Sequence, residues 1–439
     1  MPRMTRPCWM ICLAVLWSQA GSAARADDPP ANDWDQATAC FGKQDYAGAV
    51  RHLDAMIAAK APAEIAEPAT RRSVQFRWRY SHLGAIYQTR ADALTYQGKW
   101  AAALADCTVA LDLGVADPDL RRIEGYCHLG LGEYDPAIAA FNALTAAEPR
   151  EIHGYYGRAM ARLMLRRYDE ALGDLDELQS IALSTAALQV QAAIRMSRYE
   201  HDLALADLDE AVRVAPQNPA VLTQRASARM YAGQFDAARL DADEAIRLDP
   251  RNAAAYGNRA MVALHQRRHA DAIADTDEAI RLDPSRAGNY YENRAQVRWE
   301  QRDAAGALAD LDLAARTRPD DPKLAAIRAR FLATAADAQH RDGPAALALA
   351  SQAVERTKRA DPAALTALAE AHAALGDFPR AVEAAEAASK LPPADPVEWR
   401  IDGTSGTTLN VSFWFTDHDP ARTRRDLEAA LARYRAGKP

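Results

Sequence analysis

The stretches DLDEAVRVAP (residues 207–216), DADEAIRLDP (241–250) and DTDEAIRLDP (275–284) repeat nearly the same text at a spacing of 34 residues. A fixed period of about 20–50 residues is typical of a stack of similar supersecondary units, not of one globule around a single core. The repeat therefore decides the architecture of most of this chain.

The unit that ends at Pro250 shows what each repeat contains. Its first half carries Leu222 and Met230 among apolar residues at helical spacing, and Gly233 interrupts that pattern. Its second half carries small residues such as Ala242 on one face. Each unit is thus predicted to form two antiparallel helices joined by a short turn, which approach each other closely where the side chains are small.

This pattern of small, aromatic, glycine and proline positions resembles the tetratricopeptide repeat (TPR). The resemblance implies an all-α fold, an α-solenoid of about ten antiparallel helix pairs. It does not cover the alternating stretch TTLNVSFWF (407–415), which predicts a strand. We expect a signal peptide (1–26), a degenerate first repeat (27–65), a connecting or extra helix (66–83), seven repeats (84–326), two further repeats (327–391), a non-repeat insertion (392–420) and a capping helix (421–439).

The first 26 residues have the features of a secretory signal. Arg3 and Arg6 precede an apolar run over 9–17, and small residues end at Ala26. The apolar run is far shorter than the roughly 20 residues that span a membrane. We therefore expect cleavage after Ala26 and a periplasmic or secreted protein with no stable membrane span; an uncleaved anchor is the alternative.

Net charge and motifs exclude several classes of function. The chain carries a formal charge of −7, and removal of the three arginines in the signal segment would make it −10. Such a charge disfavours nonspecific nucleic-acid binding. There is no glycine-rich phosphate loop, no nucleophile elbow and no His-x-x-x-His motif on a helix, and the histidines are scattered. We therefore expect a non-catalytic protein without a cofactor.

Three cysteines, Cys40, Cys107 and Cys127, remain after cleavage. Their spacing does not make a zinc site. Cys107 and Cys127 fall in neighbouring predicted helices, so they could form a disulfide. Two buried thiols are the favoured alternative.

Five units contain Asp-x-Asp, a pattern that suggests metal binding. Side chains at i and i+2 of a helix point about 200° apart, so the two carboxylates cannot share one ligand. Most of these units carry an arginine 16 residues before the first aspartate. Repeats that lack this arginine usually lack the aspartate as well. One repeat keeps the aspartate, Asp207, but has Gln191 in place of the arginine. The pattern predicts structural ion pairs between the two helices of a unit: Arg90–Asp106, Arg158–Asp174, Arg225–Asp241, Arg259–Asp275 and Arg294–Asp310.

In proteins that resemble this one, the first helices of the repeats line a groove in which the partner lies. The residues at the corresponding positions here are Tyr126, Tyr156, Met160, Met164, Met196, Met230, Tyr231, Met261, His265 and Trp299. Methionine and aromatic side chains form an adaptable apolar surface suited to a peptide. Alternatively, the methionines pack between helices. Binding of copper or haem through them is disfavoured, because methionines about one repeat apart do not converge on one atom. The carboxylate clamp of the family is not matched, since its lysines are absent.

The sequence thus predicts an exported scaffold that binds another protein or a peptide through this groove. The alternative is a structural or assembly subunit of a cell-envelope complex that uses its outer surface and the segment 403–419. The identity of the partner and the oligomeric state stay open.

Overall fold

The computed structural model describes residues 31–61, 63–72, 74–392, 397–401, 409–413 and 420–438. The chain divides into two compact units, one built mainly from residues up to Arg166 and the other from Arg167 onward. The predicted signal peptide and parts of the predicted insertion 392–420 lie outside the described residues.

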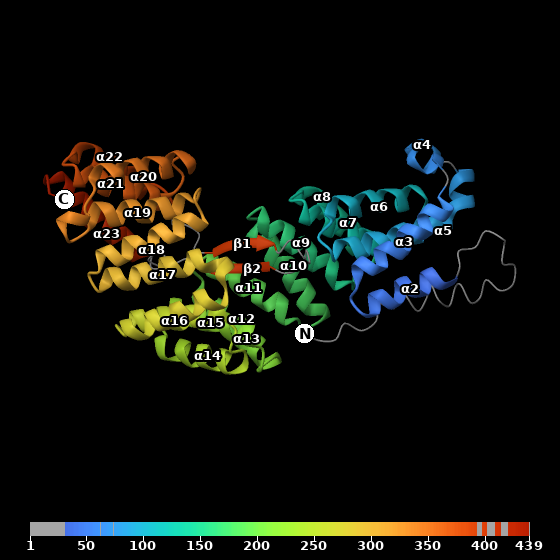
Figure 1. The fold of residues 1–439 in the computed structure, drawn as a ribbon, viewed down its shortest axis with the longest axis horizontal. Coiled ribbons are helices and arrows are strands. Elements are labelled where there is room, and N and C mark those ends of the chain that lie inside the picture. The colour runs from blue at the N-terminus through green and yellow to red at the C-terminus, as the bar shows by residue number, and fades with distance from the viewer. Residues whose placement is uncertain are drawn as a thin grey trace. The chain divides into compact units, whose positions relative to one another are not determined.

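The first unit consists of helices that stack on one another (Figure 1). Its elements are α2 (Ala31–Gly42), α3 (Tyr46–Lys60), the 3-10 turn η1 (Ala63–Ala66), α4 (Pro68–Arg71), α5 (Val74–Thr95), α6 (Trp100–Asp112), α7 (Pro118–Gly130), α8 (Tyr134–Ala147) and α9 (Ile152–Met164).

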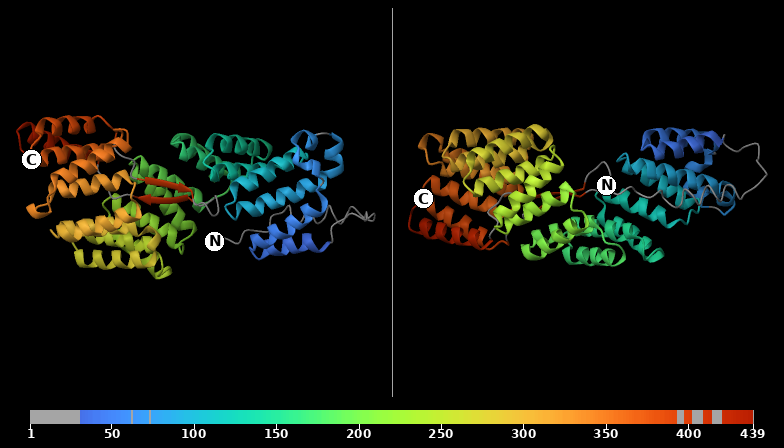
Figure 2. Two further views of the ribbon diagram at one scale, coloured as in Figure 1. Left: turned by 45° about the horizontal axis from the view of Figure 1, so that its top comes forward. Right: turned by 90° about the horizontal axis from the view of Figure 1, so that it is seen from below.

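The second unit continues the same alternation of helices and adds two short strands, which pair in a two-stranded sheet. Figure 2 shows the stacked helices from two further directions. Its elements are α10 (Tyr168–Ile181), α11 (Thr185–Ser197), α12 (His201–Val214), α13 (Pro219–Tyr231), α14 (Phe235–Leu248), α15 (Ala253–His265), α16 (His269–Leu282), η2 (Pro284–Arg286), α17 (Ala287–Glu300), α18 (Ala304–Thr317), α19 (Pro322–Thr334), η3 (Ala338–His340), α20 (Gly343–Arg356), α21 (Pro362–Ala374), α22 (Phe378–Ser389), β1 (Val397–Ile401), β2 (Leu409–Phe413) and α23 (Pro420–Arg435).

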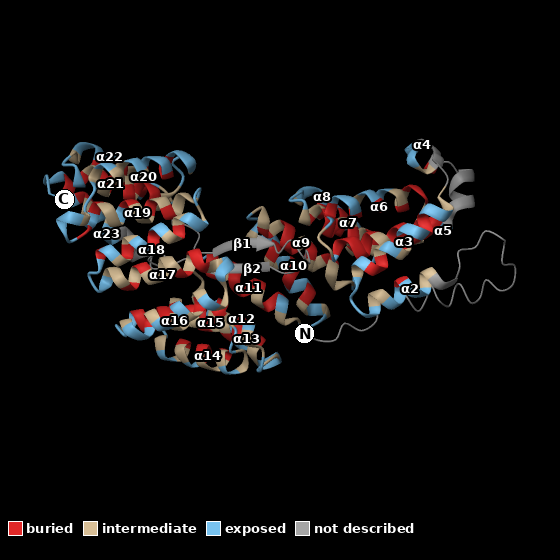
Figure 3. Cartoon of the chain, in the orientation of Figure 1, coloured by how far each residue is buried: buried red, intermediate tan, exposed pale blue. Residues whose placement is uncertain are grey.

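The predicted fold class, an α-solenoid of helix pairs, is confirmed. The odd-numbered helices from α5 to α21 are the first helices of their repeats, and the even-numbered ones from α6 to α22 are the second; α2 and α3 precede them as a pair. Buried residues gather where the helices meet (Figure 3). At these contacts Ala226, Ala238 and Ala245 have no exposed surface, as expected for closely packed backbones.

The segment predicted as a connecting or extra helix has two parts. A short helix, α4, comes first, and the rest extends the N-terminus of α5, which begins at Val74. Arg71 Nη2 and Arg72 Nε donate to the two oxygens of Asp112 at the end of α6, at 2.9 and 2.7 Å. Although burial opposes this effect, the two arginines hold the pKa of Asp112 below its usual value. The ion pairs fasten α4 to α6.

Capping residues fix where several first helices begin. Asp117, Asn218, Asp321 and Asp361 each precede a proline, and each side chain accepts a hydrogen bond from the backbone N–H two residues on, at 2.9–3.0 Å. The cap satisfies one of the N–H groups that have no partner within the helix. The proline has no N–H group, so it needs no partner there. Local sequence therefore sets the register of each pair.

In most repeats the turn between the two helices contains one residue with positive φ. Gly233 has φ +74° there, which costs glycine little. The corresponding turns of other repeats place Arg267 (φ +57°) and Arg302 (φ +64°) in the same conformation. A side chain makes this conformation less favourable by about 1–2 kcal/mol.

This difference predicts the outcome of exchanging residues between turns. Arg267→Gly should raise the free energy of unfolding by about 1 kcal/mol, because it relieves the backbone without removing an ion pair found in the described residues. Gly233→Ala should lower it by a similar amount, since no atom within 4 Å would contact the added Cβ. Urea denaturation followed by circular dichroism measures both; a loss of stability in Arg267→Gly would contradict the account.

Candidate functional site

Three arginines on first helices of the second unit each join two repeats. Arg225 holds Asp241 of its own repeat with Nε and Nη2, at 2.9 and 2.7 Å. Its third nitrogen, Nη1, donates to Asp209 of the preceding repeat at 2.8 Å. Arg259 grips Asp275 and Asp243 in the same way, and Arg294 grips Asp310 and Asp277. We call this series the arginine–aspartate ladder.

The structure brings together four of the five predicted ion pairs. They are Arg90–Asp106, Arg225–Asp241, Arg259–Asp275 and Arg294–Asp310. The fifth, Arg158–Asp174, joins residues of two different compact units and stays a prediction. In the first unit Arg90 also reaches back, to Asp54 of the preceding repeat at 2.7 Å.

The second aspartate of the Asp-x-Asp pattern has a role that the sequence reasoning missed. Asp209 and Asp243 each accept from an arginine 16 residues later in the chain, the separation already found inside the repeats. Testing that separation from the second aspartate would have found these contacts. Because one carboxylate bonds within its repeat and the other bonds to the next, the motif fastens neighbouring repeats together.

One rung of the ladder is incomplete. Gln191 stands where an arginine would hold Asp207, and its Nε2 instead donates to Asp176 of the preceding repeat at 2.6 Å. Asp207 pairs with Arg195 on one oxygen only. Gln191 Oε1 and Asp207 Oδ2 are buried without a hydrogen-bond partner among the described residues. Burial raises the pKa of Asp207 to about 6, against the effect of Arg195.

The prediction that the methionines form a partner surface is wrong for four of them. Met160, Met196, Met230 and Met261 are 0–3% exposed. Their thioethers fill the space between closely packed helices, the alternative left open by the sequence, so no partner reaches them in this structure. Met164 is partly exposed.

The predicted aromatic residues differ in exposure. Tyr126 is buried, Tyr156, Tyr231 and Trp299 are partly exposed, and His265 is exposed. In the second unit, the ring of His265 stacks on Phe235 with centroids 4.8 Å apart, and Trp299 lies 4.1 Å from Phe331. These rings leave apolar edges at the surface of the second unit.

In the first unit, the first helices bring a polar cluster together. Arg122 of α7 donates from Nε to Asp119 Oδ1 at 2.5 Å and from Nη2 to Asp92 Oδ1 of α5 at 3.0 Å. Burial alone would lower the pKa of Arg122, but Asp92 and Asp119 raise it well above its usual value. The guanidinium therefore stays charged, and it links two successive first helices. We call Asp92, Asp119 and Arg122 the Arg122 cluster.

Tyrosines surround the Arg122 cluster. Tyr96 keeps 37% of its surface exposed, yet burial raises the pKa of its phenol to about 12, with a further contribution from Asp92. Burial likewise raises the pKa of Tyr156 on α9 to about 12. This face of the first unit is our candidate functional site.

Packing behind this face fixes two of the tyrosines. The ring of Phe141 on α8 occupies the space where Gly125 of α7 and Gly157 of α9 would carry a Cβ. Tyr126 directly follows Gly125, and Tyr156 directly precedes Gly157. The rings of Tyr126 and Phe141 pack edge to face with centroids 5.2 Å apart. One aromatic ring thus positions side chains of two first helices.

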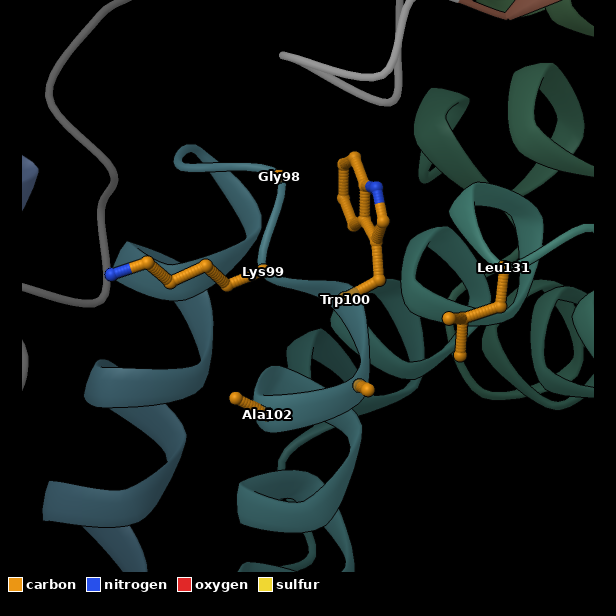
Figure 4. Close-up of a pocket in the computed structure, with 6 residues that line it drawn as sticks. Gly98, Lys99, Trp100, Ala102 and Leu131 are labelled. Carbon is orange, nitrogen blue, oxygen red and sulfur yellow. The ribbon is translucent and has the colours of Figure 1, made fainter.

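A hollow in the first unit lies at its turns. Trp100, Lys99 and Gly98 line it on one side and Leu131 on the other, around about 400 Å³ (Figure 4). The indole fits closely against Gly130, where a Cβ would overlap the ring. The lining is apolar and carries no convergent polar groups, so it offers little specificity.

Cys107 and Cys127 are free thiols in the core of the first unit. Contact with Cys127, together with burial, raises the pKa of the Cys107 thiol. Thiols in such surroundings are poor nucleophiles and poor metal ligands. Among the described residues, no group of three or more His, Cys, Asp and Glu side chains could hold a metal ion. None of the described helices is both long and apolar enough to cross a membrane.

Stacked helix pairs fastened by a side-chain ladder define an α-solenoid repeat protein. The family model described as tetratricopeptide repeat matches residues 89–152, 128–187, 223–287 and 332–396, which together make up just over half of the chain. The chain therefore belongs to the tetratricopeptide repeat family.

Solved structures of similar fold have low sequence identity to this chain. Yeast Tom70 is 16% identical with a TM-score of 0.49, and the match covers 91% of this chain and 95% of Tom70. A tetratricopeptide repeat protein from Parabacteroides merdae is 19% identical with a TM-score of 0.44, covering 57% of this chain and 92% of that one. YrrB, a TPR protein with an unusual peptide-binding site, is 18% identical with a TM-score of 0.34, covering 40% and 92%. No curated protein matches the chain.

The incomplete rung predicts the effect of Gln191→Arg. The new guanidinium would hold both Asp207 and Asp176, as Arg225 holds Asp241 and Asp209, so the free energy of unfolding at pH 7.5 should rise by about 1–3 kcal/mol. In the folded wild type the pKa of Asp207 lies above its ordinary value, so the fold favours the protonated carboxyl. The stability that this protonation contributes is present at low pH and is lost as pH rises through about 6. The advantage of the variant should therefore shrink at pH 4.5.

Urea denaturation at pH 4.5 and 7.5 measures this difference. Gln217→Arg makes the same change of charge at an exposed position and serves as the control. An equal gain at both pH values, or an equal gain in the control, would contradict the proposed role of Asp207.

Proposed function

We propose that this protein is an exported, non-catalytic scaffold that binds another protein or a peptide along the first-helix face of its repeats. Membership of the tetratricopeptide repeat family is consistent with protein–protein interaction. The observation that carries the proposal is a first-helix face of the first unit, on which the exposed Tyr96 at the end of α5 and the partly exposed Tyr156 of α9 lie on either side of α7, the helix that carries Arg122.

The chemistry of this face suits a protein ligand. Tyrosine combines a large apolar ring with a polar end, and it loses little conformational entropy when it binds. A segment of extended chain that follows the stacked first helices would meet Tyr96 at the end of α5 and Tyr156 on α9. The Arg122 cluster lies among the rings, so it adds charge that could fix the register of such a segment.

Site-specific crosslinking tests the binding face. With a photoreactive phenylalanine at Tyr156, irradiation of cells that produce the full chain should yield a discrete adduct, because the partner would lie against that side chain. The matched control replaces Ala139, an exposed residue of the second helix α8. Adducts at Ala139 but not at Tyr156 would assign the interaction to the outer surface instead, as the assembly-subunit alternative requires.

Export has a test of its own. The mature protein should begin at Asp27, because the small residues before it form the expected cleavage site. Amino-terminal sequencing of protein recovered from the periplasm or medium measures this. A chain that keeps Met1 and stays in the cytoplasm would contradict export and leave the binding proposal standing.

A further inference from the structure

The incomplete rung at Gln191 differs from a complete rung by one positive charge. In the complete rung one period later, Arg225 and Arg229 both hold the buried carboxylate of Asp241. Arg225 also holds Asp209, whose side chain is 58% exposed. Two arginines therefore meet two carboxylates, and the guanidinium of Arg225 bridges a buried carboxylate and an exposed one.

The incomplete rung has carboxylates at both corresponding positions but one arginine in place of two. Arg195, one period before Arg229, pairs with Asp207. Asp176, at the exposed end of the rung, accepts from Gln191 Nε2 at 2.6 Å. Because the amide of glutamine is neutral, these four side chains carry one excess negative charge. The rung therefore lacks one cation, at the place that an arginine fills in the next repeat.

Two oxygen atoms at this place have no hydrogen-bond donor within the part of the chain that the structure describes. Gln191 is 3% exposed, and its Oε1 is the free end of an amide whose Nε2 bonds to Asp176. Asp207 Oδ2 is the other, since Arg195 bonds to Oδ1 only. Buried acceptors without a donor are costly, and a bound donor removes that cost.

Gln191 and Asp207 lie on facing sides of one helix pair. They occupy the same positions on α11 and α12 that Arg225 and Asp241 occupy on α13 and α14, 16 residues apart, where the guanidinium and the carboxylate are in direct contact. Arg195 follows Gln191 by one helical turn on the same face of α11, and it reaches Asp207. This contact places the Gln191 face of α11 against the Asp207 carboxylate.

The place of the missing guanidinium borders solvent. In the complete rung the side chain that fills it, Arg225, is itself 14% exposed. Without that arginine, the side chain of Asp207 is 11% exposed, against 6% for Asp241 and 1% for Asp310 in complete rungs. Asp176 is exposed at the outer end. A small cation can therefore approach from the surface along the rung.

We propose that the incomplete rung binds a guanidinium group supplied from outside the chain. The group would donate to Gln191 Oε1 and Asp207 Oδ2 and so restore the charge balance of a complete rung. A guanidinium fits because planar N–H donors fill this place in the complete rungs. A bound water molecule would satisfy an oxygen but leave the charge unbalanced. This site lies in the second unit and goes beyond the proposed partner face of the first unit.

Thermal unfolding of the purified full chain, followed by circular dichroism at pH 7.5, tests the site. Asp207 is ionised at this pH, because its pKa is about 6. Methylguanidinium chloride at about 50 mM should raise the thermal midpoint of the wild type by about 1–3 °C relative to potassium chloride at the same concentration, since it binds the folded state. Gln191→Arg fills the site from within and Asp207→Asn removes its charge, so neither midpoint should rise.

The control Gln217→Arg makes the same substitution at an exposed position and should keep the response of the wild type. A second probe, the acetylated amide of Gly-Gly-Arg-Gly-Gly, distinguishes the two sources of a guanidinium. A rise with both probes assigns the site to an arginine side chain of a bound peptide. A rise with methylguanidinium alone assigns it to a free guanidino compound.

Three results would overturn the site. They are a wild-type midpoint that rises with neither probe, a rise in Gln191→Arg or Asp207→Asn equal to that of the wild type, and loss of the response in Gln217→Arg. The crosslink at Tyr156 is independent of these results, so failure of the site and failure of the scaffold function are distinguishable.

Discussion

The contact on which the array depends is one arginine that holds two carboxylates of different repeats. Arg225 joins Asp241 within its own repeat and Asp209 in the preceding one, and Arg259 does the same one period later. Helix pairs that share mostly alanine contacts have few large side chains to fix their register. The planar guanidinium, which bonds in defined directions, supplies that register. The ladder thus sets the spacing of successive first helices in the second unit.

Much of the fold could be predicted from the sequence because its signals are local and repeated. Proline, glycine and the capping residues recur at fixed positions, so helix starts such as Pro118, Ile152 and Pro219 were predictable. The start of α5 at Val74 was not, since 66–83 has no counterpart in the period. The intra-repeat ion pairs were predictable because their two members are present or absent together.

The candidate site was predicted less well, because exposure depends on packing between repeats and not on position within one. Met230 and Met261 occupy positions that meet a partner in similar proteins, but alanine neighbours leave space that these long side chains fill. Asp92 and Arg122 escaped notice because they come from different repeats and follow no shared pattern. Only the three-dimensional structure shows that they meet beside Tyr126.

The seat of Phe141 between Gly125 and Gly157 has a consequence for moving these repeats into other proteins. The ring belongs to one repeat and the second glycine to the next, so the two repeats form one indivisible cassette. Splitting the cassette would set a Cβ against the ring and displace Tyr126 and Tyr156 together. In a chimaeric array, the junctions with another repeat protein would therefore have to fall outside 118–164. That stretch is the smallest part of the first unit whose partner-binding surface could be transferred intact.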